Sequence, residues 1–576
     1  MSAGPFRVWA PAAQAVDLVL GPRRVPMTRG GGGWWSADVS ADPQTLYGFS
    51  VDGGAPRPDP RSAWQPEGIR SLSRVVDHGA FAWTDVGWQP AALGDGLVYE
   101  MHVGTFSPEG TFDGAARRLA HLAALGVTHV LLMPLAEAPG RRGWGYDGVL
   151  LYAPHHAYGG PEGLKRFIDA AHARGLAVVI DVVYNHLGPS GNHLAELGPY
   201  FTNRYLTPWG TAVNLDGPGS DEVRRFFFDN AVSWLRDYHA DGLRLDAVHA
   251  LHDESAFPFL EELVATVSSL ERDLGRVLVL VAESDFNDPR LVRPRVQGGY
   301  GLDAQWSDDF HHALHVVLTG ERTGYYEDFG TLADLAKAFR SAFVYDGRYS
   351  VHRGRRHGRK PEGLPGHAFF AYMQTHDQVG NRARGERSAH LMSPGRQRIA
   401  AALVLLSPFV PMLFQGEEWG ARTPFPYFTD HDDPALAESV RVGRCGEFAA
   451  FGWKPEDIPD PQAESTFAMA RLDWTEPESE PHASLLAWHR DLSRLRRETP
   501  ALRDGDLGRV HVRFDEGARW IVVERPPITV AANLAPEPRS LRLEREGRVR
   551  LASEDGVRLS ACELTLPPDS VAVVES

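Results

Sequence analysis

Eight short apolar segments, with helix-like stretches between them, constrain this chain more than any other feature. In the helix-like stretches, such as AARRLAHLAAL and EGLKRFIDAAHARG, apolar residues recur at spacings of three and four. Strands that alternate with helices form parallel sheets, and eight such units predict a closed (β/α)8 TIM barrel of the α/β class. The predicted strands are LVYEMHV (97–103), THVLLMP (128–134), AVVIDVVY (177–184), GLRLDAV (242–248), VLVLVAE (277–283), LDAQWS (302–307), FFAYMQT (369–375) and VPMLFQG (410–416).

The segments on either side of the barrel predict two further domains, which a chain of 576 residues has room for. Residues 1–90 hold short alternating runs broken by glycine and proline, as is typical of an antiparallel β-sandwich. Residues 91–503 form the predicted barrel domain, and its segment 187–220 is too long for an ordinary loop and predicts a lid over the barrel mouth. Residues 504–576 return to strand-like fragments and predict a C-terminal antiparallel β domain.

Composition and charge exclude several classes of function. A formal net charge of -16 argues against a protein that coats nucleic acid, because such surfaces need clustered Lys and Arg. Two cysteines, Cys445 and Cys562, cannot build a disulfide framework, and no apolar run is long enough to cross a bilayer. We therefore expect a soluble cytoplasmic protein with no membrane partner.

Polar residues that end the predicted strands are the candidates for chemistry, because active sites of such barrels lie at the C-terminal ends of the strands. In GLRLDAVH, Arg244 and Asp246 are two residues apart and therefore point to the same face of the strand. The guanidinium of Arg244 would keep Asp246 ionised, as a nucleophile requires. The alternative is a structural Arg–Asp pair in the core.

Glu283 ends an almost wholly apolar strand, where burial raises the pKa of a carboxyl group and keeps it protonated as a general acid. Alone, it could equally be a solvated residue at a strand end. Together with Asp246 on the preceding strand, it would place two carboxyl groups about 5 Å apart around one bond, which is the arrangement of a retaining glycosidase.

Two further strand endings carry residues suited to contacts with sugar hydroxyls. Asp377 and His376 lie in THDQVGN, and His186 follows DVVYN. Each also has a structural alternative, since Asp and Asn are common in turns. Their shared position at one end of the barrel favours the functional interpretation.

These four segments resemble the four signature regions of the α-amylase superfamily of retaining α-glucan enzymes. The resemblance implies that Asp246 is the nucleophile, Glu283 the proton donor and Asp377 the transition-state stabiliser. It also implies sugar contacts by Arg244 and by further residues. These are Tyr146 in GWGYDG, and His186 and His376 in the cleaved subsite. His249, Asp308, Asp309 and His311 are candidate contacts on the leaving-group side, and each could equally be a polar loop residue. Gln378 and Asn381 complete the candidate set.

Further motifs, among them YEMHVGTFSPEGTF, PYFTNRY, WSDDFHHALH and TGYYEDFG, resemble the malto-oligosyltrehalose trehalohydrolase family within that superfamily. Members of that family hydrolyse the α-1,4 bond joining a terminal trehalose to a maltooligosaccharide, in coupling with a maltooligosyltrehalose synthase. The closest rival is a 1,4-α-glucan branching enzyme, which uses the same triad and a similar N-terminal sandwich. A non-catalytic glycan-binding protein is a distant alternative, because the three acidic residues are intact.

Metals and cofactors have no clear signal in the sequence. Some relatives bind calcium near the position of Asn185, but no cage of the six or more oxygen ligands that calcium prefers can be identified. We therefore expect no metal and no cofactor.

Overall fold

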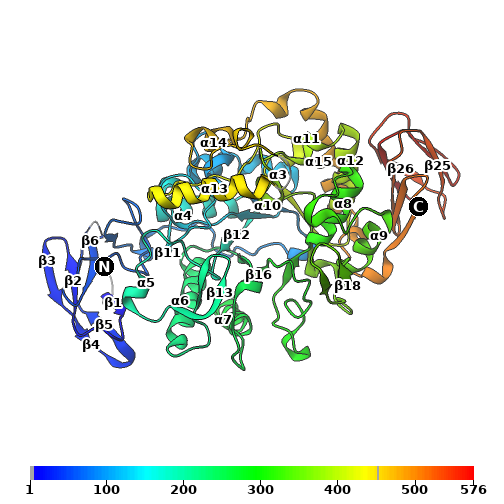
Figure 1. The fold of residues 1–576 in the computed structure, drawn as a ribbon. Coiled ribbons are helices and arrows are strands. Elements are labelled where there is room, and N and C mark those ends of the chain that lie inside the picture. Colours follow the sequence, from blue (N-terminus) through cyan, green and yellow to red (C-terminus); the bar gives the residue numbers. More distant parts are fainter. Residues whose placement is uncertain (1–5, 44, 450–452) are drawn as a thin grey trace.

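The computed structural model describes residues 6–43, 45–449 and 453–576, which form three parts along one long axis (Figure 1). Antiparallel sheets near the N-terminus lie at one end, a closed barrel with its helices lies in the middle, and antiparallel sheets near the C-terminus lie at the other end. The predicted fold class, a TIM barrel flanked by two β domains, is confirmed.

The barrel strands are all parallel, and in the described residues they close in the order β12-β15-β16-β17-β20-β21-β8-β9. Each strand lies inside one of the eight predicted segments. Their bounds are β8 Val98–Met101, β9 His129–Leu132, β12 Ala177–Val182, β15 Gly242–Leu245, β16 Val279–Ala282, β17 Ala304–Trp306, β20 Phe369–Ala371 and β21 Val410–Phe414.

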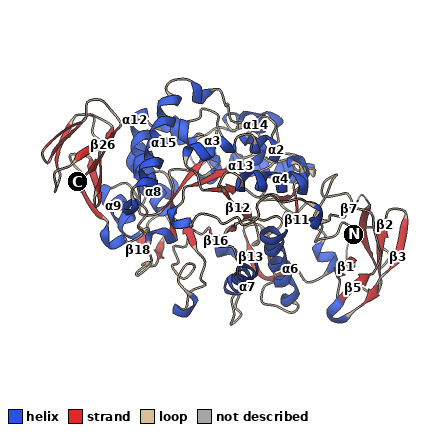
Figure 2. Cartoon of the chain, turned by 180° about the vertical axis from the view of Figure 1, so that it is seen from behind, coloured by secondary structure: helices blue, strands red, loops and turns tan. Residues whose placement is uncertain are grey.

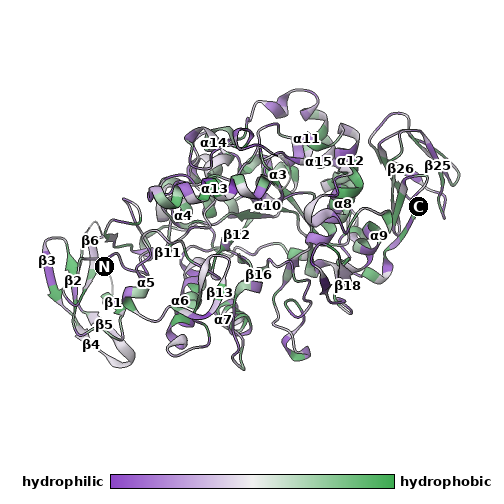
Figure 3. Cartoon of the chain, viewed as in Figure 1, coloured by the Kyte–Doolittle hydropathy of each residue, from purple (hydrophilic) through white to green (hydrophobic). Residues whose placement is uncertain are grey.

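Side chains inside the barrel form a packed apolar layer that includes Val98, Val179, Val281 and Met412. Side chains on the opposite face of the same strands, such as Ile180 and Leu280, pack against the surrounding helices. Figure 3 shows the result, since the barrel strands are coloured as hydrophobic and hydrophilic colour gathers in the outer loops and at β18 (Asp346–Ser350). The barrel is therefore filled by side chains, and a substrate can reach only its ends.

Helices surround the barrel (Figure 2) and carry the amphipathic pattern that the sequence predicts. Thr319 ends α8 and is followed by Gly320, whose left-handed backbone (φ 79°) suits glycine. The helices that follow barrel strands are α3 Leu119–Leu125, α4 Gly160–His172, α6 Ser220–Val232, α7 Phe259–Leu274, α8 Asp308–Thr319, α12 Pro394–Leu405 and α15 His482–Glu498.

The N-terminal domain consists of two sheets, with strand orders β1-β5-β4 and β3-β2-β6-β7. It is joined to the barrel domain by ion pairs from Arg57 to Glu196 (3.0 Å) and from Arg61 to Asp229 (2.7 Å). The strands are β1 Phe6–Trp9, β2 Val16–Leu20, β3 Arg23–Pro26, β4 Thr28–Arg29, β5 Trp34–Ala37, β6 Leu46–Val51 and β7 Ser73–Arg74.

The long segment after β12 contains a short helix, α5 (Leu194–Leu197), and a hairpin of β13 (Phe201–Thr207) with β14 (Gly210–Val213). Trp209, in the turn of this hairpin, is 49% exposed. After β21, at the same end of the barrel, lies the helix α13 (Pro434–Ala449). Both segments follow the C-terminal ends of barrel strands.

The C-terminal domain has a sheet of order β22-β23-β24-β29-β26 and a second sheet of order β25-β28-β27. Arg525 of β23 (Trp520–Arg525) joins this domain to the barrel, because its Nη1 donates to the main-chain oxygens of Leu406 and Ser407. The other strands are β22 His511–Asp515, β24 Ile528–Asn533, β25 Arg539–Arg542, β26 Arg548–Ala552, β27 Arg558–Ser560, β28 Glu563–Leu566 and β29 Ser570–Glu575. None of the helices within the described ranges is long and apolar enough to cross a membrane.

Candidate active site

Polar side chains at the C-terminal end of the barrel lie on the same strand face as the apolar side chains of the packed core. Val179 and Val281 belong to the apolar layer, and Asp181 and Glu283 follow two residues later on the same strands. A spacing of two keeps side chains on one face of a strand. The acidic groups therefore converge over the core at one end of the barrel.

Arg244, at the end of β15, lies at the centre of this group and is fully buried. Its Nη1 donates to Asp246 Oδ1 at 2.7 Å and to both oxygens of Asp181 at 3.0 and 2.9 Å. Its guanidinium lies 4.4 Å from the ring centre of Trp306, so one of its faces is held by an aromatic ring. The Arg244–Asp246 pair predicted from the sequence is present.

Asp246 is oriented from two sides. Besides Arg244, the Nδ2 of Asn185 donates to its main-chain oxygen (2.8 Å) and to its Oδ2 (2.9 Å). The side chain of Asp246 is 12% exposed, so one part of the carboxylate faces the cleft. A carboxylate that is ion-paired, oriented and partly open can attack a substrate carbon.

Glu283 follows β16 and has the surroundings of a general acid. Burial raises its pKa to about 8 against the lowering effect of Arg244, and the negative charges of Asp246 and Asp377 add to the rise. Its Oε2 accepts a hydrogen bond from the main-chain nitrogen of Ala247 at 2.7 Å. Glu283 is therefore protonated at neutral pH, which allows it to donate a proton to a leaving group.

Ala247, between the nucleophile candidate and this bond, has a positive φ of 39°. A residue other than glycine in this region stores backbone strain of about 1–3 kcal/mol and needs a surrounding structure that holds it. The bond from Ala247 to Glu283 is part of that structure, and it ties the two carboxyl groups together.

Asp377 is the second residue of the short helix α10 (His376–Gly380) after β20, and its side chain is 43% exposed. Its Oδ1 lies 3.6 Å from His376 Nε2 and 3.5 Å from the Nδ2 of Asn381. Asn381 in turn accepts a hydrogen bond from Arg444 of α13 at 3.2 Å. Asp377 is the most open of the three acidic candidates, as a group that contacts substrate hydroxyls would be.

His376 and Tyr146 lie beside these acids. The hydroxyl of Tyr146 donates to Asp181 Oδ2 and contacts His376 Nε2, both at 2.8 Å. The two rings are stacked with centres 5.3 Å apart. Burial raises the pKa of Asp181 to about 7, and its ion pair with Arg244 opposes that rise.

Asp308 and Gln378 complete the polar lining. Tyr372 donates to Asp308 Oδ1 at 2.6 Å, and Gln378 lies 3.4 Å from the same oxygen. Burial raises the pKa of Asp308 to about 6. The carbonyl oxygen of the Gln378 side chain caps α10 by accepting from Thr375, so only its amide nitrogen faces Asp308.

Aromatic side chains on loops form the edge of the cleft. His186 is stacked on Trp209 of the β13–β14 hairpin, with ring centres 4.4 Å apart and planes 6° from parallel. His249 packs 4.9 Å from Phe286, and both line a groove of about 190 Å³. This groove also includes Ser284, the residue after Glu283, so it extends from the acid end of the site.

Two predicted leaving-group contacts, Asp309 and His311, are occupied by structural partners and are withdrawn as substrate contacts. Asp309 is 3% exposed, and its Oδ2 accepts from the main-chain nitrogens of Val344 and Tyr345 at 2.6 Å. His311 is 1% exposed, and its ring nitrogens contact Met373 O (2.7 Å) and Tyr326 Oη (2.8 Å). Both lie on α8, and their side chains are buried against neighbouring segments instead of facing the cleft.

Several residues of the site were not predicted, among them Asp181, Glu100 and Trp209. Asp181 and Glu100 lie two residues beyond core valines of β12 and β8, and this spacing could have revealed them. Trp209 sits in the turn of a hairpin whose position relative to the barrel has no local sequence signal.

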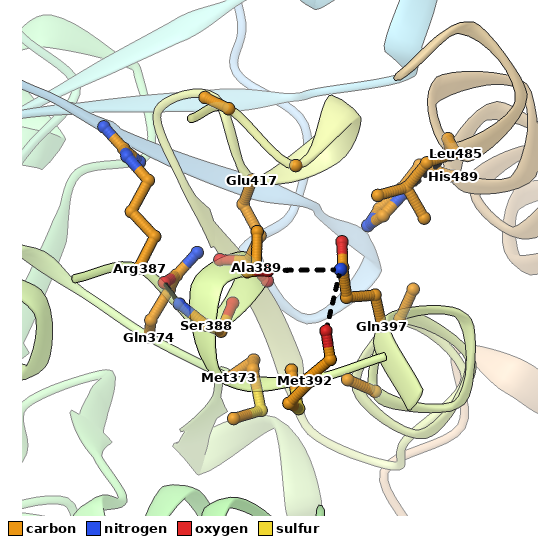
Figure 4. A pocket seen from close by; sticks show the side chains of 14 residues that line it. Met373, Gln374, Arg387, Ser388, Ala389, Met392, Gln397, Glu417, Leu485 and His489 are labelled. Carbon is orange, nitrogen blue, oxygen red and sulfur yellow. Dashed lines mark hydrogen bonds between the residues drawn. The ribbon is translucent and has the colours of Figure 1, made fainter. Parts of the chain in front are cut away.

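A second cavity lies away from the acidic residues, between β20, α12 and α15 (Figure 4). Gln374, Arg387, Glu417 and Gln397 line it, and its volume is about 10 Å³. That is room for about one water molecule and not for a sugar ring. The open end of the barrel is therefore the better place for a glucan.

One group of residues within the described ranges has ligand atoms of the kind that hold a metal. Atoms of Glu137, His155 and His156 lie within 4.8 Å of one another. Glu137 already accepts hydrogen bonds from the main chain and Nδ1 of His156, both at 2.7 Å. Asn185, near the calcium position considered above, is bonded to Asp246.

Comparison with known families agrees with the three-part structure. Residues 4–64 match the model of carbohydrate-binding module 48, the isoamylase N-terminal domain. Residues 77–204 match the catalytic domain of alpha amylase, and residues 505–573 match a domain of unknown function, DUF3459.

The chain is 52% identical to the malto-oligosyltrehalose trehalohydrolase of Arthrobacter ramosus, over 99% of each chain. It is 43% identical to the enzyme of the same name from Saccharolobus solfataricus, over 90% of this chain and 89% of that one. The chain belongs to the malto-oligosyltrehalose trehalohydrolase family. Within the alpha-amylase fold it is thus a glycosidase.

A solved structure and a member of the rival family give two further comparisons. An alpha-amylase candidate from Salmonella typhimurium has a TM-score of 0.90 and 40% identity, with 99% of this chain and 97% of that chain covered. A 1,4-alpha-glucan branching enzyme from Xanthomonas campestris is only 25% identical, over 92% of this chain and 69% of its own length. The trehalohydrolase family is therefore much nearer than the rival predicted from the sequence.

Proposed function

We propose that this enzyme hydrolyses the α-1,4-glucosidic bond next to the terminal trehalose of maltooligosyltrehalose, releasing trehalose and a maltooligosaccharide with retention of configuration. The observation that carries the proposal is the 52% identity to a malto-oligosyltrehalose trehalohydrolase over 99% of both chains. The geometry supports it through a paired carboxylate, Asp246, and a protonated carboxyl group, Glu283, on neighbouring strands.

In the first step of this mechanism, a carboxylate oxygen of Asp246 attacks the anomeric carbon of the glucosyl unit. The bond from that carbon to the trehalose oxygen breaks, and Glu283 transfers its proton to the departing oxygen. Arg244 holds the attacking carboxylate in place, at 2.7 Å from Oδ1. Trehalose leaves, and the glucan remains bound to Asp246 through an ester.

In the second step, the ionised Glu283 takes a proton from water, whose oxygen attacks the same carbon and displaces Asp246. Asp377 and His376 lie 3.6 Å apart beside the reacting sugar and would hydrogen-bond its hydroxyls. Two displacements at one carbon restore the α configuration.

A product analysis tests the proposal. Maltooligosyltrehalose and a maltooligosaccharide of equal length are incubated separately with the enzyme, and products are identified by chromatography and by proton NMR in the first minutes. We expect trehalose from the first substrate, slow turnover of the second, and an α-configured new reducing end. Formation of α-1,6 branches from amylose without release of trehalose would instead establish the branching activity.

The substrate implies a partner reaction. A glucan whose reducing end is converted to trehalose must come from an enzyme that rearranges that terminal bond, so we propose functional coupling to a maltooligosyltrehalose synthase. A cytoplasmic location is part of the same proposal. The two cysteines, Cys445 and Cys562, support it because both are free thiols.

A further inference from the structure

Two buried glutamates of this chain each contact both the main-chain nitrogen and the ring Nδ1 of a histidine, an arrangement that we call a clamp. The carboxylate of Glu100 accepts from the main-chain nitrogen of His376 at 2.9 Å through one oxygen and contacts Nδ1 at 2.6 Å through the other. Glu137 grips His156 with the same pair of contacts, both at 2.7 Å. The first of these clamps lies near the end of β8 in the active site, and the second lies at the end of β10 (Ala136–Glu137), outside it.

Counting hydrogens in the first clamp fixes the state of His376. Asp181, with a pKa of about 7, is mainly a carboxylate at pH 7.5 and accepts the single hydroxyl hydrogen of Tyr146 at 2.8 Å, so the contact of Tyr146 with His376 requires a hydrogen on Nε2. A carboxylate only accepts, so the contact with Glu100 requires a hydrogen on Nδ1 as well. A histidine with hydrogens on both nitrogens is an imidazolium.

The charges around His376 agree with this count. Burial alone lowers its pKa, but Glu100 and Asp377 outweigh burial and raise that pKa to about 9, while Arg244 opposes them. Asp181 and His102 also interact electrostatically with His376 from β12 and from the end of β8. Trp144 and Trp306 close the remaining sides with ring edges.

We propose that Glu100 is a positioning residue of the hydrolysis, which holds His376 as an imidazolium and so directs a chain of hydrogen bonds through Tyr146 and Asp181 to Arg244 and Asp246. Every bond of this chain then has one direction: His376 donates to Tyr146, Tyr146 donates to Asp181, and Arg244 donates to both aspartates. Both ring nitrogens of His376 are then donors, and neither is an acceptor.

The proposal predicts that the reaction rate depends on pH through the protonation of His376, which Glu100 controls, and not only through the acidic triad. With Glu100 replaced by Gln, the ring loses the charge that keeps it protonated, and its pKa falls toward the ordinary value near 6.5. At pH 7.5 only about a tenth of the rings would then be protonated, whereas nearly all are protonated when the pKa is about 9.

The test compares Glu100→Gln with Glu137→Gln, which removes the same charge from the matched clamp outside the site. We expect kcat of Glu100→Gln to fall about tenfold at pH 7.5 and by less than threefold at pH 5.5, so that its alkaline limb moves to lower pH. The Glu137→Gln profile should keep its shape. The inference rests on the proposed function, so turnover is followed on maltooligosyltrehalose and on a second α-glucan that the wild type cleaves.

A second measurement does not depend on turnover. Nitrogen-15 NMR of histidine-labelled protein, with His376 assigned from its absence in His376→Gln, should show an imidazolium at pH 7.5 in the wild type and a neutral ring in Glu100→Gln. A neutral His376 in the wild type, or an equal loss of kcat at both pH values, would overturn the proposal. Absence of trehalose release with an intact imidazolium signal would instead count against the proposed substrate only.

Discussion

The floor and the rim of the cleft differ in how their side chains are held. The floor, made of Arg244, Asp246, Asp181, His376 and Glu100, lies at strand ends, and its side chains bond to one another. The rim, made of Trp209, Phe286 and Asp377, follows the strands, and its side chains are 40–50% exposed. The floor is thus fixed by the barrel, whereas the rim is placed by loops, which can change without disturbing the core.

Removing the nucleophile from the floor should have the largest effect. Asp246→Asn keeps the size of the side chain and its bond to Asn185, but an amide cannot form the covalent intermediate, so kcat should fall by about four orders of magnitude or more. Steady-state rates of trehalose release measure this effect.

The matched control is Asp181→Asn, which removes a carboxylate from the same guanidinium without removing the attacking group. It should retain measurable turnover. Both variants should keep the circular dichroism spectrum of the wild type. More than a few per cent of wild-type activity in folded Asp246→Asn would rule out Asp246 as nucleophile.

The general acid should produce the next largest effect, and a characteristic one. Because burial raises the pKa of Glu283 to about 8, its acid form is present below that pH and is lost as the pH rises through it. We expect kcat/KM to be level near neutrality and to fall above about pH 8. Glu283→Gln should lower kcat by about two to four orders of magnitude and should abolish this limb.

A leaving group that needs no proton tests the same role. With an activated aryl maltooside, Glu283→Gln should lose much less activity than with maltooligosyltrehalose, because departure of an acidic phenol does not require a general acid. An equal loss with both substrates would show that Glu283 acts in another way.

The contrast between floor and rim also explains what the sequence could predict. All eight strands were predicted because their segments are mainly apolar, and Arg244 and Asp246 were found as a charged pair in one strand and Glu283 as the last residue of another. Glu100 and Asp181 obey the same rule of spacing, but each sits inside a predicted strand and so could be taken for a core residue. Asp309 shows the opposite error, because it was predicted to contact the substrate. A polar residue after a strand can instead bind the main chain of a neighbouring segment, as Asp309 does with Val344.

The rim could not be predicted in this way. Trp209 reaches His186 only because the β13–β14 hairpin folds back over the barrel mouth, and no periodicity in the sequence describes that path. Phe286 likewise depends on the course of the loop after β16. Tertiary placement of loops, rather than local propensity, decides which of their side chains join the site.

A single rim aromatic should have the smallest effect, and mainly on binding. Trp209 is 49% exposed, and its indole stacks on His186, so it offers an apolar surface to the glucan without touching the acids. Stacking of this kind contributes about 0.5–1.5 kcal/mol, so Trp209→Ala should raise KM about threefold to tenfold and leave kcat within about twofold. Leu206→Ala is the matched control, because Leu206 is 78% exposed on the same hairpin and makes no ring contact. Its KM should equal that of the wild type. A fall in kcat for Trp209→Ala as large as the rise in KM would place Trp209 with the floor, because its ring would then hold His186 in the orientation that the reaction needs.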